Sequence, residues 1–329
     1  MMNILVTGGA GYTGSLLIRD LLREGYRVVC VDNLRYGGES LLDVWAHENF
    51  TFHKCDLTDA KQLRDIVRRS DLHAIVHLAA IVGDPACKRE PELARKVNGD
   101  ASKYLFQLAN EYGIPRFLFA STCSNYGKML DPDGYVDETS PLAPISLYAE
   151  LKVKFEELLL DRKEGDGGFC PVSLRFATIY GMSPRMRFDL TVNEFTKELA
   201  LGRELKVYGE QFWRPYCHVR DYSRAVIAIL RAPQEAVAYN VFNVGDTNEN
   251  FTKKMIVEAL LQVIPGGKVT YTKINEDPRD YRVSFHKITE VLGFRASHSL
   301  AQGIGEIMSV VHAGVFLNTE DDRFYNIPH

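Results

Sequence analysis

Continuous apolar runs of strand length alternate with amphipathic stretches of helical length through the first half of the chain. A run that is apolar throughout predicts a strand buried on both faces, and the mixed stretches between such runs predict helices. Because parallel strands are joined by right-handed crossovers, this alternation indicates an α/β fold with a doubly wound parallel sheet. The predicted strands are 3–7, 27–32, 50–55, 73–78, 116–121 and 169–176, and the predicted helices are 12–24, 59–69, 91–112 and 147–163.

The second half of the chain has a less regular pattern. Turn-forming residues recur after the sixth predicted strand, among them Gly181, Gly202 and Gly209, and they interrupt any long periodic segment. We therefore expect residues 1–180 to form the sheet domain, with later segments around 216–250 packing back on it. Residues 181–329 should form mainly a smaller C-terminal α/β lobe.

Composition and charge argue against several classes of protein. The 39 basic and 43 acidic residues give a net charge of -4, and neither sign forms a block that would bind a nucleic acid or an anionic membrane. The six cysteines form no C-x-x-C pair, so neither a metal site nor a disulfide framework is indicated. Without a signal peptide pattern or an apolar run of about 18 residues, we expect a cytoplasmic protein with no membrane partner.

A glycine-rich segment follows the first predicted strand and opens the first predicted helix. It reads Thr7-Gly8-Gly9-Ala10-Gly11-Tyr12-Thr13-Gly14. A bound pyrophosphate needs a tight turn, a backbone without side chains and the N–H groups of a helix N-terminus, and this spacing provides all three. The alternative is an ordinary strand-to-helix turn, in which glycines are also common.

Asp32, at the end of the second predicted strand, supports a dinucleotide site. A carboxylate there accepts hydrogen bonds from the adenosine ribose and repels a 2′-phosphate, which favours NAD over NADP. Arg35, three residues later, is an argument against this preference for NAD. Asp56 and Leu57 close the third strand and are candidates to meet the adenine, although a helix cap is a nearly equal interpretation of this pair.

Tyr148 and Lys152 are spaced i, i+4, which places both side chains on one face of a helix. A free tyrosine has a pKa near 10, and a nearby cation lowers that value, so the pair is suited to removing a hydroxyl proton. Thr122 lies at the end of the fifth strand, at the sheet edge where open α/β folds bind ligands. The solvated helix surface is the alternative for Tyr148 and Lys152 taken alone.

These motifs, in this order, resemble the extended short-chain dehydrogenases/reductases, and within them the NAD-dependent nucleotide-sugar epimerase/dehydratase family. The resemblance runs over nearly the whole chain and implies a Rossmann sheet. It is carried by Gly8, Gly11 and Gly14, Val31-Asp32-Asn33-Leu34, His77-Leu78-Ala79-Ala80, Asn98, Thr122, Tyr148 with Lys152, Arg175-Phe176-Ala177-Thr178-Ile179-Tyr180-Gly181, His218-Val219-Arg220-Asp221 and Phe242-Asn243-Val244-Gly245.

The resemblance implies a role for each matching residue. Thr122 would supply the hydroxyl of the catalytic set, Tyr148 would act as base and acid, and Lys152 would bind the nicotinamide ribose while tuning Tyr148. Arg214 and Arg279 match arginines that hold the substrate diphosphate, for which a guanidinium is well shaped. The implied cofactor-binding residues are Gly8, Gly11, Tyr12, Thr13, Gly14, Asp32, Asn33, Asp56, Leu57, Leu78, Ala79, Ala80, Asn98, Tyr148 and Lys152.

Departures from the family pattern narrow the expected chemistry. The 4,6-dehydratases carry an acidic pair after the strand-end threonine, whereas Cys123 and Ser124 stand here, so dehydratase activity is disfavoured. Thr178 replaces the asparagine of the 4-epimerases near the substrate phosphates. Val82 lies in a segment that either lines the sugar pocket or is an ordinary loop with a helix start. The candidate substrate-binding residues are Val82, Cys123, Ser124, Thr178, Arg214 and Arg279.

The sequence thus predicts an NAD-dependent nucleotide-sugar 4-epimerase, which oxidises a sugar C4 hydroxyl and reduces it again. A nucleotide-sugar 4-dehydrogenase or 4-ketoreductase needs the same residues and is the alternative. A non-catalytic NAD-binding protein is a third interpretation, but such proteins typically lose the tyrosine or the lysine. The resemblance also implies a homodimer in which helices 91–112 and 147–163 of two copies form a four-helix bundle.

Overall fold

The computed structural model describes residues 2–129, 131, 134–161, 168–272 and 279–327. The chain divides into two compact units, each assembled from three segments. The first unit comprises Met1–Thr122, Ser146–Arg175 and Ser223–Phe242, and the second comprises Cys123–Ile145, Phe176–Tyr222 and Asn243–His329. The predicted division into domains near residue 180 stays a prediction.

A seven-stranded sheet has the order β10-β6-β5-β4-β1-β2-β3. The pairs β1–β2, β2–β3, β1–β4 and β4–β5 are parallel, so the predicted doubly wound sheet is confirmed. In the central strand β4, all four residues are buried. The strands are β1 (Asn3–Thr7), β2 (Arg27–Asp32), β3 (Phe50–Lys54), β4 (Ala74–His77), β5 (Arg116–Thr122), β6 (Cys170–Phe176) and β10 (Asn240–Val244).

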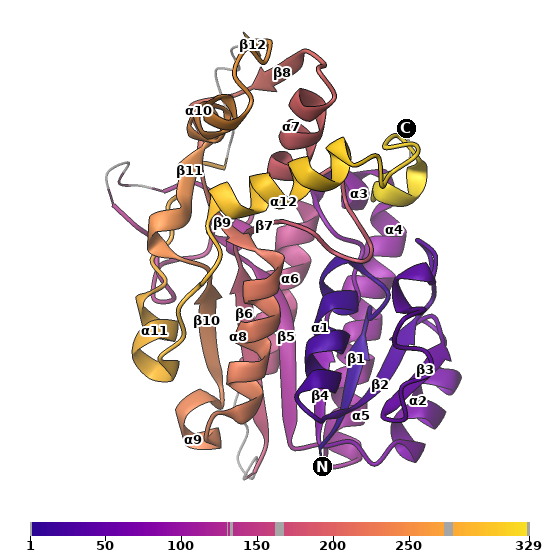
Figure 1. Ribbon diagram of the computed structural model, residues 1–329. Helices are drawn as coiled ribbons and strands as arrows, with labels where there is room; N and C mark the ends of the chain where they lie inside the picture. The colour runs from indigo at the N-terminus through magenta and orange to yellow at the C-terminus, as the bar shows by residue number, and fades with distance from the viewer. Residues whose placement is uncertain (1, 130, 132–133, 162–167, 273–278, 328–329) are drawn as a thin grey trace. The chain divides into compact units, whose positions relative to one another are not determined.

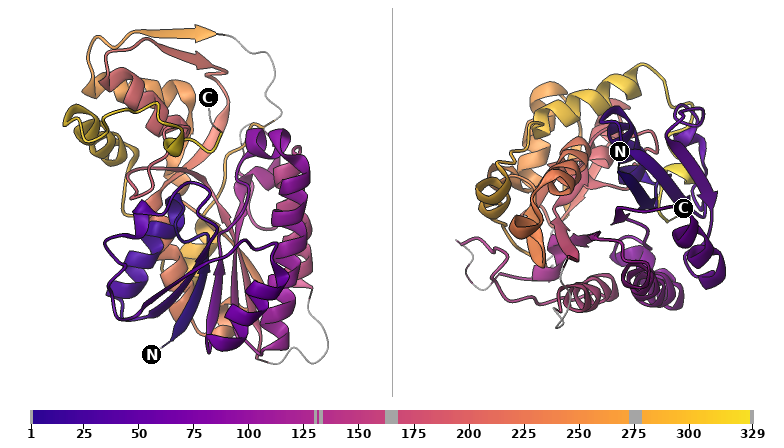
Figure 2. Two further views of the ribbon diagram at one scale, coloured as in Figure 1. Left: turned by 90° about the vertical axis from the view of Figure 1, so that its right-hand side faces the viewer. Right: turned by 90° about the horizontal axis from the view of Figure 1, so that it is seen from below.

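Helices cover both faces of this sheet (Figures 1 and 2). In the first unit α2, α5 and α6 lie side by side on one face, and α1 lies on the other. The helix predicted at 91–112 is three consecutive pieces, because a π-helical turn separates two α-helical parts. The bounds are α1 (Tyr12–Arg23), α2 (Ala60–Arg69), α3 (Asp84–Arg89), α4 (Pro91–Ala94), the π-helix η2 (Arg95–Ala101), α5 (Ser102–Glu111), α6 (Leu147–Leu160), α8 (Val219–Arg231) and α9 (Gln234–Val237).

Aromatic rings fill the layer between the sheet and the face covered by α2, α5 and α6. Phe119 of β5 and Phe155 of α6 meet edge to face with centroids 4.6 Å apart, and Phe106 of α5 contacts both Phe117 and Phe155. Burial of each such ring contributes about 1.5–3 kcal/mol. This core fixes α6 against β5, and α6 carries Tyr148 and Lys152.

The second unit contains two small sheets, with strand orders β11-β9-β7 and β12-β8, and its own apolar core. Among the described residues, no helix is long and apolar enough to cross a membrane. The elements are β7 (Thr178–Tyr180), α7 (Thr191–Ala200), β8 (Leu205–Tyr208), β9 (Trp213–His218), β11 (Asn250–Thr252), α10 (Lys253–Val263), β12 (Val269–Thr272), α11 (His286–Leu292) and α12 (Leu300–His312). Short helical turns are η1 (Glu39–Leu41), η3 (Cys123–Tyr126), η4 (Thr247–Glu249) and η5 (Asp322–Phe324).

A buried ion pair ties α6 to β6 in the first unit. The Glu156 carboxylate accepts hydrogen bonds from Arg175 Nη2 at 2.5 Å and from Ser173 Oγ at 2.6 Å. The side chains of Glu156 and Arg175 are 4% and 5% exposed. Two charges out of water are stable only when each satisfies the other, so this pair couples the position of α6 to the sheet.

We expect Glu156→Ala to lower the free energy of unfolding by about 3–5 kcal/mol, because it leaves the Arg175 guanidinium buried without its partner. Urea denaturation followed by circular dichroism measures this. Glu235→Ala, at an exposed position of α9 in the same unit, should change the value by less than about 0.5 kcal/mol. A loss below about 1 kcal/mol for Glu156→Ala would show that the pair does not anchor α6.

Candidate active site

The glycine loop after β1 packs so closely against the segment after β4 that side chains are excluded. Gly8 has a φ of +73°, and a Cβ added there would lie 2.8 Å from the backbone nitrogen of Ala79. A Cβ on Gly14 would overlap the Gly8 carbonyl oxygen. Gly11 is the N-cap of α1 and offers no side-chain cap, so the first-turn N–H groups of α1 remain available to an anion.

Asp32 joins the end of β2 to this loop. Its Oδ2 accepts a hydrogen bond from the backbone N–H of Ala10 at 3.0 Å, and its Oδ1 accepts one from Leu34 at 2.8 Å. The carboxylate therefore lies beside the glycine loop, where the sequence predicts an adenosine ribose.

Asp56 forms the turn after β3 and does not cap α2. Partial burial raises the pKa of Asp56, but hydrogen bonds from Thr58 and Asn33 outweigh it, and the net pKa is lowered. Asn33 Nδ2 donates to Asp56 Oδ2 at 2.8 Å, which links two of the predicted adenosine-side residues. The cap of α2 is Asp59, whose side chain accepts from the Gln62 N–H. Of the two interpretations, the structure places Asp56 outside the helix cap.

A buried histidine network positions the end of β4. Thr7 Oγ1 and His77 Nδ1 are 2.7 Å apart, and His77 Nε2 and Ser102 Oγ are 2.9 Å apart. Ser102 Oγ donates to the Val97 carbonyl, so it must accept from His77 Nε2, and Thr7 must donate to Nδ1. Thr7 Oγ1 then accepts from the Ala79 N–H at 3.3 Å. The network is complete only with neutral His77, and burial followed by the charge of Lys152 lowers the pKa of His77 to about 3.

Asn98 lies in the π-helix η2 and is almost fully buried. Its Oδ1 accepts from the Ile81 N–H at 2.8 Å, and its Nδ2 donates to the Ile81 carbonyl at 2.9 Å and toward Cys87 Sγ at 3.8 Å. The side chain therefore fixes the backbone just before Val82. π-helical turns are frequent at functional sites because they place a side chain where a regular helix cannot.

The start of α6 is fixed by its cap. Ser146 Oγ accepts from the Ala149 N–H and donates to Asp84 Oδ1 at 2.6 Å. Asp84 begins α3, so the helix start that the sequence allows at Pro85 is present, with Val82 just before it. This contact links the segment after β4 to the first turn of α6, which carries Tyr148.

Lys152 is buried against β5 and reaches toward Tyr148. Its Nζ donates to the Ala120 carbonyl at 2.6 Å and lies 4.5 Å from the Phe119 ring centroid and 5.7 Å from the Tyr148 ring centroid. Burial lowers the pKa of Lys152 to about 7. Thr122 is the last residue of β5, so the first unit contains all three predicted catalytic residues, on two elements in direct contact.

The predicted substrate residues other than Val82 belong to the second unit. Cys123 and Ser124 form the turn η3; Cys123 is only 1% exposed and packs inside, while Ser124 is half-buried. Thr178 of β7 pairs with Tyr216 of β9, and Arg214 lies two residues before Tyr216. Because side chains alternate along a strand, Thr178 and Arg214 share one face of this small sheet.

Arg214 is held by its neighbours on β9 and by the segment that follows Arg279. Its guanidinium lies 5.3 Å from the Tyr281 ring centroid, and its Nη1 donates to the Trp213 carbonyl at 2.6 Å. Asp280 Oδ1 accepts from the Trp213 N–H at 2.8 Å. The two predicted phosphate-binding arginines are therefore on segments that are hydrogen-bonded to each other.

The His218–Asp221 motif is architectural. His218 stacks on His298 with centroids 4.7 Å apart, and its Nε2 lies 3.2 Å from Glu306. Asp221 accepts from the backbone N–H groups of Ser297 and His298. The motif thereby fixes the start of α12 inside the second unit.

The chain is similar to known proteins of one family. A model of the NAD dependent epimerase/dehydratase family matches residues 4–245. The chain belongs to this family. A UDP-glucuronate 4-epimerase from Thermodesulfobacterium geofontis (strain OPF15) is 28% identical over 310 residues, which cover 91% of this chain and 93% of the relative.

Two further relatives show the range of the family. A dTDP-glucose 4,6-dehydratase from Streptomyces niveus is 30% identical over 317 residues, which cover 93% of this chain and 91% of the relative. The solved structure of UDP-glucose 4-epimerase with UDP-glucose from Thermotoga maritima superimposes with a TM-score of 0.84 at 28% identity, and covers 96% of this chain and 100% of that chain. The chain is therefore an enzyme of this family.

NAD is the cofactor of the family, and the first unit fits it. Gly8 and Gly14 let the loop pack against its neighbouring backbone where a Cβ would clash, and Gly11 leaves the N-terminus of α1 without a side-chain cap, as a bound pyrophosphate requires. Asp32 beside the loop fits a ribose, and Lys152 lies against β5 with Tyr148 nearby. The predicted cofactor is thus consistent with the shape and the charges of this part of the chain.

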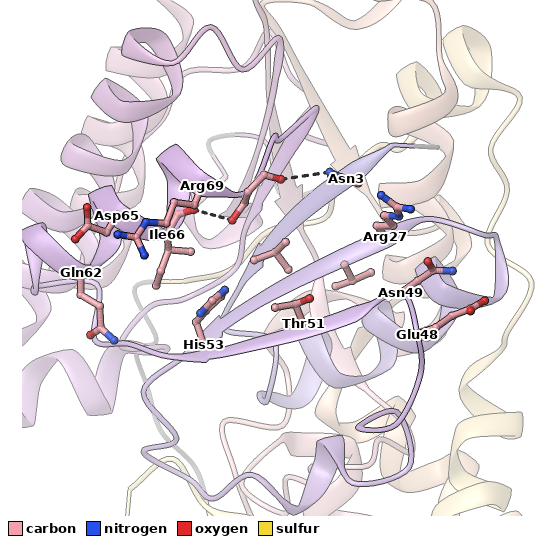
Figure 3. Close-up of a pocket in the computed structure, with 13 residues that line it drawn as sticks. Asn3, Arg27, Glu48, Asn49, Thr51, His53, Gln62, Asp65, Ile66 and Arg69 are labelled. Atoms are coloured by element: carbon pink, nitrogen blue, oxygen red, sulfur yellow. Dashed lines mark hydrogen bonds between the residues drawn. The ribbon is translucent and has the colours of Figure 1, made fainter.

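A separate polar cleft of about 550 Å³ lies in the first unit (Figure 3). Arg27, Glu48 and Asn49 line one end, and Asp65 and Arg69 line the other. The cleft includes the first residues of β1 and β2, whereas the glycine loop and Asp32 lie at the opposite ends of these strands. It is therefore distinct from the cofactor site.

Sequence reasoning missed residues that act behind the site. Ser102 and Cys87 were absent from the predicted set, yet Ser102 completes the His77 network and the Cys87 thiol donates to the Ile81 carbonyl at 3.2 Å. The contact of Ser102 joins it to a residue in another part of the chain, and neither serine nor cysteine is a distinctive residue type here. The one available signal was the position of Ser102 one helical turn after Asn98.

We expect Lys152→Met to change the pH dependence of stability. The ordinary lysine pKa of 10.5 is lowered to about 7 in the fold. Below pH 7 Lys152 is protonated in both the folded and the unfolded protein, so the full cost of burying its charge is present. Between pH 7 and 10.5 the unfolded protein binds more protons than the folded protein, so the free energy of unfolding rises with pH. The Met variant should therefore be more stable than wild type at pH 6, by roughly 5 kcal/mol, and this difference should shrink toward pH 10.

Urea denaturation of the cofactor-free protein at several pH values measures this difference. Lys61→Met, on α2 with an exposed side chain, serves as the control and should differ from wild type by a constant amount. A difference for Lys152→Met that does not vary with pH would contradict the buried, depressed lysine.

Proposed function

We propose that this protein is an NAD-dependent nucleotide-sugar 4-epimerase, which oxidises the C4 hydroxyl of the sugar to a keto intermediate and reduces it again. The observation that carries the proposal is the placement of Lys152 between β5 and Tyr148, with Thr122 at the end of that strand and the glycine loop in the same unit. The relatives named above act on UDP- and dTDP-linked sugars according to their names.

Tyr148, Lys152 and Thr122 have different roles in the proton transfer. The Tyr148 oxygen removes the proton of the C4 hydroxyl, and the nearby Lys152 ammonium favours the phenolate that does so. The Thr122 hydroxyl binds the same substrate oxygen and orients it. When bound, NAD supplies hydride acceptance and hydride return at C4. On the return, Tyr148 gives the proton back to the C4 oxygen, so nothing is consumed.

The second unit supplies the groups for the substrate's diphosphate. Arg214 and Arg279 lie on hydrogen-bonded segments, and a guanidinium donates two parallel hydrogen bonds to phosphate oxygens. Thr178 shares the sheet face of Arg214 and offers a hydroxyl. Cys123 and Ser124 provide no carboxyl group, which supports an epimerase over a dehydratase, because eliminating water needs an additional acid and base.

The family resemblance also underlies our proposal of a cytoplasmic homodimer built from α5 and α6 of two copies. None of the large exposed hydrophobic side chains in the described part of the chain lies on these helices. Their exposed positions include Lys103, Gln107, Glu150, Lys154 and Glu157. Such a bundle would be joined by hydrogen bonds and ion pairs around a small apolar centre.

Purified protein incubated with UDP-, GDP-, CDP- and dTDP-sugars tests the function. We expect reversible inversion at C4 of one class of sugar with no net absorbance change at 340 nm, because the hydride is returned to the substrate. Nuclear magnetic resonance of the sugar products distinguishes the two configurations. Stoichiometric NADH with an accumulated keto sugar would support the 4-dehydrogenase alternative instead.

We expect Tyr148→Phe to lower kcat by about 10²- to 10⁴-fold, the usual range for losing a general base, while NAD binding changes little. Steady-state kinetics and a calorimetric titration with NAD measure the two effects. Tyr112→Phe removes the same atom from a partly buried tyrosine of the first unit, whose hydroxyl contacts Arg64, and should retain full activity. Turnover that survives in Tyr148→Phe would refute the proposed mechanism.

A further inference from the structure

The adenosine end of the cofactor site contains two residues with opposite preferences. An acidic residue at the end of β2 favours NAD, whereas an arginine nearby accommodates the 2′-phosphate of NADP. This chain has Asp32 and also Arg35. The preference therefore depends on whether the Arg35 guanidinium is available to a phosphate.

The backbone around Arg35 is fixed. The Arg35 N–H donates to Asn33 Oδ1 at 3.1 Å, and the preceding Leu34 has a φ of +60°, held by its hydrogen bond to Asp32. A non-glycine residue adopts this left-handed conformation only when its surroundings impose it. The direction in which Arg35 leaves the turn is thus set by the same carboxylate that faces the ribose.

The Arg35 guanidinium forms an ion pair with Glu90, which lies between α3 and α4. Its carbon also lies 5.9 Å from the Tyr36 ring centroid, so it is held on two sides. The side chains of Arg35 and Glu90 are only 32% and 34% exposed. Partial burial weakens the competition from water, so the pair is firmer than one on an open surface.

Glu90 is itself held in place by its backbone. Its N–H donates to the Ala86 carbonyl at 3.0 Å, and its carbonyl accepts from the Ala94 N–H at 2.9 Å. Pro91 follows directly and begins α4. Two short helices therefore fix the backbone position from which the Glu90 carboxylate reaches Arg35.

We propose that Glu90 is a specificity-determining residue for the cofactor: it engages Arg35 in an ion pair and so prevents this guanidinium from binding a 2′-phosphate. Asp32 repels the phosphate directly, and Glu90 removes the cation that would otherwise compensate. This inference rests on the cofactor site described above. It does not depend on which sugar the enzyme uses.

The test compares NAD and NADP binding to wild type and Glu90→Gln by isothermal titration calorimetry, without any sugar. The amide keeps the size of the side chain and removes its charge. We expect the Kd for NADP to fall about 3- to 10-fold, the order expected when a partly buried pair releases one partner. The Kd for NAD should stay within about twofold, so the ratio of the two constants is the readout.

Two further variants make the result specific. Glu92→Gln removes a carboxylate two residues away whose side chain is 84% exposed and pairs with Arg95, and it should leave the ratio unchanged. The double variant Glu90→Gln/Arg35→Gln should lose the gain in NADP binding, because the released guanidinium is absent. Thermal melts of all variants confirm that each one is folded.

A purely structural role for the pair predicts a different pattern. In that case Glu90→Gln weakens NAD and NADP binding by the same factor, and the ratio does not move. An unchanged ratio, or a gain that persists without Arg35, would overturn the proposal. Wild-type protein that bound neither cofactor would contradict the cofactor site itself. If the ratio changes but the protein is inactive on every sugar, the proposed function is rejected and the inference about Glu90 still stands.

Discussion

Close backbone packing between the ends of two neighbouring strands, β1 and β4, is the constraint on which the cofactor side of this enzyme depends. Thr7 and His77 are partners in the register of these strands, and the next residues of each chain segment bring Gly8 against Ala79. Because no side chain fits between them, the loop, the start of α1 and the segment after β4 have one relative position. The Thr7 hydroxyl reinforces this contact through the Ala79 N–H.

The same packing decides where charge can reside. His77 lies in the network behind this contact, and its hydrogen bonds are all satisfied only in the neutral form. Lys152 lies in the same buried region, against Ala120 and Phe119, and disfavours a second cation. Lys152 therefore supplies the positive charge next to Tyr148 when it is protonated, which is the arrangement a tyrosine base requires.

Several elements follow directly from local pattern. The six predicted strands match β1 to β6 to within one residue at either end, because a strand buried on both faces needs a continuous apolar run. The strand β10 and the π-helical turn in the predicted helix 91–112 were missed. Neither is encoded locally: β10 is completed by its place beside β6, and the extra residue in the turn is accommodated by the bonds between Asn98 and Ile81.

Residues close together in the chain specify the strands of the sheet, the glycine loop, the acidic strand end and the Tyr148–Lys152 spacing, so these features could be predicted from the sequence. Contacts in the folded chain are needed to establish that Lys152 is buried on the Ala120 carbonyl, that His77 is neutral and that Glu90 engages Arg35. The cause is the same for all three. Burial and pairing between distant segments fix a side chain's charge and partner, and sequence spacing carries no information about either.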